Sequence, residues 1–327
     1  MGPVSTGVVA VSLLAVLLLG GTVVTAQAPW CTITVSSSDS LRDAVSTLPP
    51  GSIVCLEPGL YEAGFEISRD LTLRGVGRAD SVILTSNGTV DRPVLSLYPN
   101  YGSSLVITLE NLTLTGAVAQ DADATAPSAD GLVVNRDTHV LLRRVVCTEN
   151  DGAGITVDRD ATLLATDCAF TANGYGAFLD SGASARFEDC VFSSNAAGAV
   201  LGQDGQTWFQ SCTVKDNSEI GIAITTGQAT LDHCSLDGNG WGIVLGAARD
   251  EPPQLRMNAC TILGSLHAGI ALMDSACFDP RLPARVPVQV SGKRNAIPSA
   301  DAENGNAGGG LCPEYPGDPW PPGFVKE

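Results

Sequence analysis

The sequence predicts an all-β fold: a right-handed single-stranded parallel β-helix solenoid with an N-terminal cap helix and a Pro-rich C-terminal wrapping tail. Three observations favour it. Cysteines recur at steps of 21, 22, 22, 22 and 26 residues, asparagines recur shortly after them, and glycines follow the asparagines. A fixed period of this length indicates one structural unit stacked on itself, in which each coil contacts only its neighbours.

The cysteine column is the clearest landmark of the repeat. We expect its members to point inward as a ladder of buried thiols: Cys147, Cys168, Cys190, Cys212, Cys234 and Cys260. A stack of asparagines follows, whose side chains can hydrogen-bond along the stack and to the turn backbone: Asn150, Asn173, Asn195, Asn217 and Asn239. The glycines after them are expected to supply the positive φ of a sharp corner.

The rest of the chain divides around these coils. Residues 1–26 contain an apolar run that ends in small residues, which indicates a signal peptide or, as the alternative, an uncleaved anchor. We expect the parallel β-helix to span residues 27–275, with the regular cysteine and asparagine coils at 131–275. Residues 276–327 are rich in proline, which central strands exclude, and are predicted to form a C-terminal cap or tail.

Residues 38–48 are predicted to form the cap helix. An apolar stripe and a proline pair that ends the helix support this: Leu41, Ala44, Val45, Leu48 and Pro49-Pro50. Short β segments separated by turn residues are expected next, at 53–56, 65–67, 71–73, 82–84, 94–97, 105–109 and 112–114. The Ala- and Asp-rich residues 116–130 break the rhythm and are predicted to project as a loop.

A leucine-rich repeat is the alternative fold, because its period is similar. That fold requires several fixed leucines in each repeat and a helical segment on its convex side. Here the corresponding positions hold Ala, Phe, Val and Ile, and every coil carries a glycine. The pattern therefore favours the β-helix.

The net charge of −17, from 35 acidic and 18 basic residues, limits the classes of partner that we expect the protein to bind. Binding to nucleic acid depends on clustered Lys and Arg, so this composition disfavours it, and it equally disfavours an anionic membrane surface. Beyond the N-terminal segment, no stretch is apolar enough to cross a membrane. We expect a protein that is secreted or held at the cell surface, or periplasmic if the source is Gram-negative.

Four cysteines stand outside the ladder. An exported chain is free to oxidise them, and we expect one disulfide between Cys31 and Cys55 and another between Cys277 and Cys312. An outward column of the predicted coils is nearly apolar: Thr156, Phe178, Val200, Ala223, Val244 and Ala271. Such a column needs a cover, which the tail around Trp320, Pro321, Pro322 and Phe324 or a second protomer would supply.

The stretch LRDAVSTLPPGSIVCLEPGLYEAGFEISRDLTLRGVG (41–77) resembles the opening of the pectin lyase-like superfamily, in which a cap helix leads to a strand, a PG-x-Y element and an L-x-L-x-G-x-G turn. The later coils resemble the parallel β-helix repeats of that superfamily. Its members include pectate lyases, pectinesterases, polygalacturonases and phage tailspikes. The catalytic motifs of the polygalacturonases and pectinesterases are absent, and Arg281-Leu-Pro-Ala-Arg285 matches the pectate lyase arginine motif only in part.

The outward positions beside the cysteine ladder are the predicted site. The candidate substrate-binding residues are Arg186, Trp208, Gln210 and Arg256, and the candidate catalytic residues are Glu188, Asp232 and His233. An indole ring stacks on the C–H faces of a sugar while polar groups fix its hydroxyls. Two rungs separate Glu188 from Asp232, roughly 9–10 Å, near the upper end of the spacing in an inverting glycosidase.

Asp167 and Asp189 on adjacent rungs are the candidate ligands for calcium, although no cofactor is required by the sequence. The favoured function is an exported β-helix protein that acts as a rigid binding or structural module, with carbohydrate as its ligand. The alternative is a polysaccharide lyase or glycoside hydrolase, and the lack of a complete catalytic motif favours the first. A third hypothesis is a homo-oligomer formed through the apolar outward column.

Overall fold

The computed structural model describes residues 30–120, 129–180, 182–202, 204–246, 253–273, 289–298, 306, 311–312 and 324–325. The chain divides into two units, Met1–Trp30 and Cys31–Glu327. The first unit, apart from Trp30, lies outside the described residues, and with it the predicted signal peptide. Among the described residues, no helix is both long and apolar enough to cross a bilayer.

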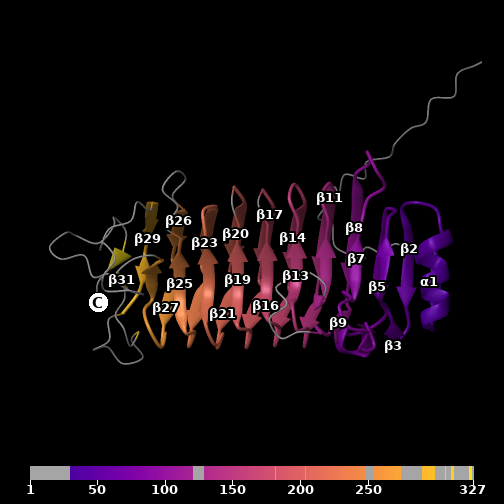
Figure 1. Cartoon of the computed structure of the whole chain (residues 1–327), viewed down its shortest axis with the longest axis horizontal. Helices are drawn as coiled ribbons and strands as arrows, with labels where there is room; N and C mark the ends of the chain where they lie inside the picture. Colours follow the sequence, from indigo (N-terminus) through magenta and orange to yellow (C-terminus); the bar gives the residue numbers. More distant parts are fainter. Residues whose placement is uncertain are drawn as a thin grey trace, which may run out of the picture. The chain divides into compact units, whose positions relative to one another are not determined.

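The second unit is a parallel β-helix of three sheets, and each coil contributes one strand to every sheet in turn (Figure 1). Sheet A has eleven strands in the described residues: β1 (Ile33–Val35), β2 (Ser52–Leu56), β5 (Leu71–Gly75), β8 (Leu105–Glu110), β11 (Thr138–Arg143), β14 (Thr162–Thr166), β17 (Ser184–Glu188), β20 (Gln206–Gln210), β23 (Gln228–Asp232), β26 (Gln254–Asn258) and β29 (Gln289–Lys293).

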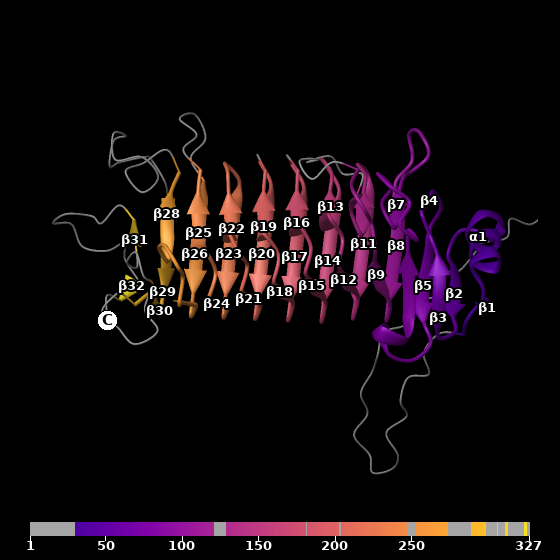
Figure 2. The ribbon, with the colours of Figure 1, turned by 60° about the horizontal axis from the view of Figure 1, so that its bottom comes forward.

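Sheet B follows sheet A in each coil and is made of short strands: β3 (Gly59–Glu62), β6 (Val82–Thr85), β9 (Thr113–Thr115), β12 (Val146–Thr148), β15 (Ala169–Thr171), β18 (Val191–Ser193), β21 (Thr213–Lys215), β24 (Ser235–Asp237), β27 (Thr261–Leu263), β30 (Asn295–Ala296) and β32 (Phe324–Val325). A 3-10 turn at Ala79–Ser81 precedes β6. The strands of sheets A and B stack in rows, as Figure 2 shows from a second side.

Sheet C completes each coil: β4 (Phe65–Ile67), β7 (Leu95–Leu97), β10 (Leu132–Val134), β13 (Ala153–Val157), β16 (Tyr175–Leu179), β19 (Ala197–Leu201), β22 (Ile220–Ile224), β25 (Trp241–Leu245), β28 (Ile270–Leu272) and β31 (Leu311–Cys312). Strands of this kind alternate an inward apolar residue with an outward one. The inward residues of all three sheets form one hydrophobic core along the stack.

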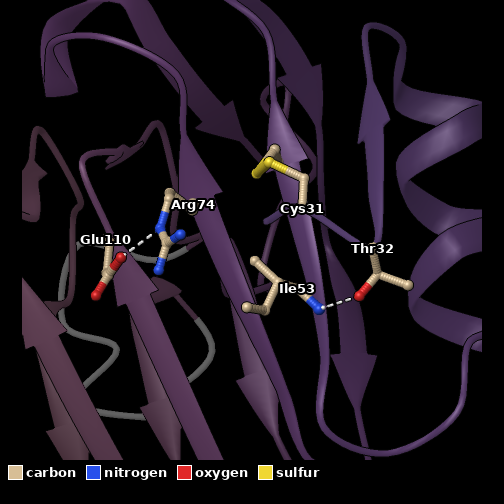
Figure 3. Close-up of a disulfide and its surroundings, with 6 residues drawn as sticks. Cys31, Thr32, Ile53, Arg74 and Glu110 are labelled. Atoms are coloured by element: carbon tan, nitrogen blue, oxygen red, sulfur yellow. Dashed lines mark hydrogen bonds and ion pairs between the residues drawn. A yellow bond between two sulfur atoms is a disulfide. The ribbon is translucent and has the colours of Figure 1, made fainter. Parts of the chain in front are cut away.

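Helix α1 (Ser38–Thr47) begins after the N-cap Ser37 and packs Leu41, Ala44 and Val45 into that core. The predicted apolar stripe therefore faces the core. The predicted Cys31–Cys55 disulfide is confirmed, with 5.7 Å between the two Cα atoms. It joins the segment before β1 to β2, beside a hydrogen bond of 2.9 Å from the Ile53 amide to the Thr32 hydroxyl (Figure 3).

The turn between sheets B and C, called here the B–C corner, contains the asparagine stack. The Asn195 side chain accepts from the Asn173 amide at 2.9 Å, donates to the Phe170 carbonyl at 3.0 Å and donates to Asn217 at 3.0 Å. Neighbouring coils repeat this pattern, with the asparagines buried. Each amide thus satisfies polar groups of two coils at once, in a place that water does not reach.

The glycines beside this stack are required for space rather than for positive φ, which corrects the expectation from the sequence. Gly198 lies within strand β19 and is not one of the described glycines that adopt a positive φ. A Cβ at this position would overlap the Gly221 carbonyl oxygen and lie 2.9 Å from a Val214 methyl. Only glycine therefore lets successive coils approach closely at this corner.

The cysteine ladder is one member shorter than predicted. Cys168, Cys190, Cys212, Cys234 and Cys260 are buried and share one column, whereas Cys147 pairs in register with Phe170 in the next column. The reason is that Asn150 comes three positions after Cys147, whereas the asparagines of the later coils come five positions after their cysteines. All six thiols are free and buried, and burial raises the pKa of Cys147.

The stack continues beyond residue 275, where the sequence predicted its end. Strand β29 pairs in parallel with β26, and β30 pairs with β27. Asn295 replaces the cysteine of this coil, and its side chain accepts from the Cys260 amide at 3.0 Å and donates to the Met257 carbonyl at 2.8 Å. Asn306 accepts from the Ser265 amide at 3.0 Å and so extends the asparagine stack. The coil escaped notice because neither landmark keeps its spacing.

Candidate functional site

The outer face of sheet A is the candidate site, and we call it the A face. Strand alternation and in-register pairing arrange its outward residues in three columns. The first holds Val106, His139, Thr162, Ser184, Gln206, Gln228 and Gln254; the second holds Thr108, Leu141, Leu164, Arg186, Trp208, Thr230 and Arg256; the third holds Glu110, Arg143, Thr166, Glu188, Gln210, Asp232 and Asn258. Successive members of a column are about 4.8 Å apart.

Trp208 lies in the second of these columns, and 39% of its surface is exposed. Its neighbour in the column, Arg186, donates to Glu188 at 2.5 Å and to Gln210 at 2.7 Å. The guanidinium therefore bridges two adjacent coils beside the indole ring. A flat apolar surface next to oriented polar groups suits a ligand that has both C–H faces and hydroxyls.

The candidate acid–base residues lie on the next coil. Asp232 follows Gln210 in the third column, so two rungs separate it from Glu188 as predicted. The Nδ1 atom of His233 lies 3.3 Å from a carboxylate oxygen of Asp232, and both side chains are exposed to solvent. His233 adopts a left-handed conformation with φ of 54°, which places it in the corner between sheets A and B.

Arg256 lies two rungs beyond Trp208 in the same column and is exposed. It makes no ion pair with another described residue. Among the described residues, Arg256 makes no hydrogen bond or ion pair with the Arg186–Glu188–Gln210 network, so the structure brings together only part of the predicted set.

The candidate calcium ligands occupy the same left-handed corner as His233. Asp167 and Asp189 have φ of 54° and 53°, on adjacent coils. Among the residues that the structure describes, no three His, Cys, Asp or Glu side chains gather closely enough to hold a metal ion. Calcium binding therefore remains a prediction from the sequence.

The register between coils also decides the column in which Arg143 lies. Aligned on Cys147, it would stand in the column of Trp208, but it pairs with Glu110 and Thr166 in the third column. There Glu110 lies 2.6 Å from Arg74 and 3.8 Å from Arg143. Figure 3 shows the Arg74–Glu110 pair. Sequence spacing does not reveal this cluster, because its three residues belong to coils of different lengths.

Asp130, which also went unnoticed, is a buried carboxyl where the chain re-enters sheet C. It is 2% exposed, and one carboxyl oxygen accepts from the Ala153 amide at 2.7 Å. The other oxygen has no hydrogen-bond partner in the described part of the chain. Burial raises the pKa of Asp130 to about 6, while the Thr156 side chain and the Ala153 amide act in the opposite direction.

Two further expectations concern the tail and the outward column of sheet C. Cys277, Trp320, Pro321 and Pro322 lie outside the described residues, as do the side chains of Cys312 and Phe324. The column itself is largely covered at its far end: Ala223, Val244 and Ala271 are buried although they point outward.

Comparisons with known proteins concern the fold. Residues 130–280 match the family described as a right handed beta helix region. No curated protein matches the chain. Among solved structures, it is similar to an alginate lyase from Paenibacillus sp. str. FPU-7, at 10% identity and a TM-score of 0.53, over 90% of this chain and 97% of that one.

Two other solved structures are similar over part of their own length. The Agl-KA catalytic domain matches at 12% identity and a TM-score of 0.54, over 80% of this chain and 50% of that one. The ORF18 protein of Geobacillus virus E2 matches at 15% identity and a TM-score of 0.49, over 71% of this chain and 56% of that one. The chain thus spans about half the length of these two relatives. Such low identities concern the fold alone.

The parallel register of all three sheets, the match to the right-handed family and the likeness to these structures agree with one another. They also agree with the resemblance of residues 41–77. No subfamily is singled out by any of them. The chain folds as a right-handed parallel β-helix.

Proposed function

We propose that this chain is an exported β-helix protein that acts as a rigid binding module for carbohydrate, through the A face around Trp208. The observation that carries the proposal is an exposed indole beside a guanidinium already oriented by Glu188 and Gln210. Binding groups that are fixed before the ligand arrives lose little conformational entropy on binding.

Export to the cell surface or extracellular space is part of the proposal. The apolar N-terminal run and the Cys31–Cys55 disulfide support it, because disulfides persist in oxidising compartments. An alginate lyase among the similar structures makes a carbohydrate-related role plausible. That likeness supplies the fold and carries no activity to this chain.

The second candidate is a polysaccharide lyase or glycoside hydrolase. The contact between His233 and Asp232 favours it, because a carboxylate beside a ring nitrogen orients the imidazole for proton transfer. The Arg186–Glu188 contact weighs against it, since this carboxylate is already engaged by a cation. A scaffold that assembles through the outward column of sheet C is the third candidate, and a strict monomer in analytical ultracentrifugation would exclude it.

The test exposes the purified protein to acidic and neutral polysaccharides, with and without calcium. Affinity-gel retention measures binding, and absorbance of unsaturated ends together with new reducing ends measures cleavage. We expect retention without product, lost in Trp208→Ala and kept in Trp208→Phe, which preserves an aromatic ring. Leu266→Ala is the matched control, because Leu266 is an exposed apolar residue of the B–C corner.

Two results would contradict the binding module. Product that disappears in Glu188→Ala or Asp232→Ala would make the protein an enzyme with its site on the A face. Absence of both retention and product across the panel would leave the scaffold as the better function. The calcium arm separates a metal-dependent ligand from one that Trp208 and its neighbours hold alone.

A further inference from the structure

The cysteine ladder places five free thiols in one column, at the corner between sheets A and B. No more than 3% of any member is exposed: Cys168, Cys190, Cys212, Cys234 and Cys260. The same chain carries the Cys31–Cys55 disulfide, which is typical of proteins in oxidising compartments. In such a compartment, stacked free thiols are reactive groups, and the proposed function leaves them unused.

The structural task of this column does not require sulfur. The Cys234 thiol donates to the Phe209 carbonyl at 3.3 Å, and the Cys234 amide donates to the Cys260 sulfur at 3.4 Å. One coil beyond Cys260, the side chain of Asn295 makes the same two contacts, with the Met257 carbonyl at 2.8 Å and the Cys260 amide at 3.0 Å. An amide is a better hydrogen-bonding group than a thiol, so what the cysteines add is their redox chemistry.

Neighbouring thiols of the ladder are one rung apart. The strands on both sides of the corner pair in register, β17 with β20 and β18 with β21, so Cys190 lies directly over Cys212. The strands that flank the other cysteines pair in the same way. A rung of about 4.8 Å lies within the roughly 4.4–6.8 Å that separates the Cα atoms of a disulfide.

The neighbouring thiols also favour reaction at Cys212. Once Cys212 loses its proton, hydrogen bonds from the thiols of Cys190 and Cys234 stabilise the charge and lower the pKa of Cys212, while burial acts in the opposite direction. The thiolate is the nucleophilic form of cysteine. Hydrogen peroxide is close to water in size, so a local opening of the corner is enough to admit it.

We propose that the cysteine ladder is a modification site at which hydrogen peroxide joins neighbouring coils by disulfides, beginning at Cys212. The Cys212 thiolate attacks one peroxide oxygen, the O–O bond breaks, and the sulfur becomes a sulfenic acid. The hydroxide that leaves takes up the proton released by the thiol and becomes water. The thiol of Cys190 or Cys234 then attacks the sulfenic sulfur, so that the S–S bond forms and a second water leaves. Two thiols are oxidised by two electrons, and the peroxide is reduced to two waters.

The modification is independent of the A face, because the thiols point into the core. At this corner the coils are otherwise joined by hydrogen bonds, such as that from the Thr213 amide to the Cys190 carbonyl at 2.9 Å. A covalent link there would oppose local opening of the stack. Because each thiol joins one neighbour, a ladder of five closes two disulfides at most and leaves one thiol free.

The test treats the purified native chain with hydrogen peroxide, stops the reaction with catalase and alkylates the remaining thiols in denaturant. Peptides are then mapped by mass spectrometry without reduction. We expect disulfides that join Cys212 to Cys190 or Cys234, each about 2 Da lighter than the two thiols, the mass of two hydrogen atoms. Met273 is exposed and should form its sulfoxide in the same sample, which shows that the peroxide was active.

Two variants identify the ladder as the source of the disulfides. Cys190→Ala combined with Cys234→Ala leaves the remaining ladder thiols two rungs apart, roughly 9.6 Å, which a disulfide does not span, so we expect no linked peptides. Cys147→Ala is the matched control, because Cys147 is an equally buried thiol outside the column, and it should keep the full pattern of links. Urea denaturation establishes that both variants are folded.

The map of the unaltered chain decides the outcome even if a variant fails to fold. Ladder thiols that are all alkylated in a sample whose Met273 is oxidised would overturn the inference. Sulfinic or sulfonic acids in place of linked peptides would overturn it as well. So would links that persist in the folded double variant, or links that are lost in Cys147→Ala.

Discussion

The B–C corner and the A face are built by the same successive coils, yet the corner repeats one residue type from coil to coil, whereas the A face varies it. At the corner, Asn173, Asn195, Asn217 and Asn239 repeat in register and are buried. On the A face, the corresponding positions of neighbouring coils hold Leu164, Arg186, Trp208 and Thr230. Repetition accompanies a structural task that is the same in every coil, whereas variation accompanies exposure to solvent.

The physical basis of this difference is the effect of a substitution on the stability of the fold. A wrong residue at the corner leaves buried amides unpaired or forces two coils apart. A wrong residue on the A face exchanges one solvated side chain for another, which changes stability little. Substitutions at the two regions should therefore separate stability from binding.

The largest expected effect is at the glycine of the corner. Gly198→Val would place its side chain against the Gly221 carbonyl and the Val214 methyl, so we expect it to destabilise the fold by about 3 kcal/mol or more. Urea denaturation measures the loss. Gly59, the first residue of β3, serves as the control site, because a Cβ there would meet no atom closer than 3.7 Å. An unchanged midpoint in Gly198→Val would show that the corner tolerates a side chain.

Breaking the asparagine stack comes next. Asn195→Ala removes the acceptor of the Asn173 amide and the donor to the Phe170 carbonyl, and both remain buried. We expect a loss of about 3 kcal/mol in the free energy of unfolding. Amide hydrogen exchange should accelerate first in the two coils that Asn195 joins. Equal acceleration of exchange in every coil would contradict this prediction, because it would mean that Asn195 does not stabilise its own two coils in particular.

Asp130 gives a pH dependence of intermediate size. The folded state keeps its proton up to about pH 6, whereas the unfolded chain releases it near 3.8. The stability that the raised pKa of Asp130 contributes is present in full below the unfolded pKa. It is lost as the pH rises through the folded pKa, which lowers the free energy of unfolding by about 2–3 kcal/mol. Asp130→Asn should remove that decline. Thermal unfolding across this pH range measures it, and an identical slope in both proteins would contradict the prediction.

The smallest effect on stability belongs to the A face. Trp208→Ala and Arg186→Ala should each lower the free energy of unfolding by less than the corner substitutions do, because 39% of Trp208 and 47% of the Arg186 side chain are exposed and a surface ion pair contributes little. Retention on a polysaccharide gel should nevertheless fall. A loss of stability in either variant as large as that of a corner variant would contradict the predicted difference between the two regions.

Much of the fold was predictable because its landmarks repeat. The cysteine and asparagine spacings locate the coils from β13 to β27, and the apolar stripe locates α1. The two coils that break the spacing were misjudged. The predicted column of Cys147 is wrong, and the coil with Asn295 lies in residues that the sequence predicts as tail, because a register counted along the chain fails where a coil gains or loses residues.

The candidate site was predictable only in part. Alternation along a strand shows that Arg186, Trp208 and Gln210 point outward, and pairing confirms that they are neighbours. The Arg74–Glu110–Arg143 cluster and the buried Asp130 gave no periodic signal. Each depends on a turn or coil of irregular length, which sequence spacing does not resolve.

The sequence by itself determined the repeating unit and its hydrophobic core, because period, alternation and composition are local properties of the chain. Only the tertiary structure decided the register between coils, and with it which side chains share the A face. Register depends on the hydrogen bonds between strands about 20 residues apart or more, and a change of two residues in one turn moves a side chain to another column.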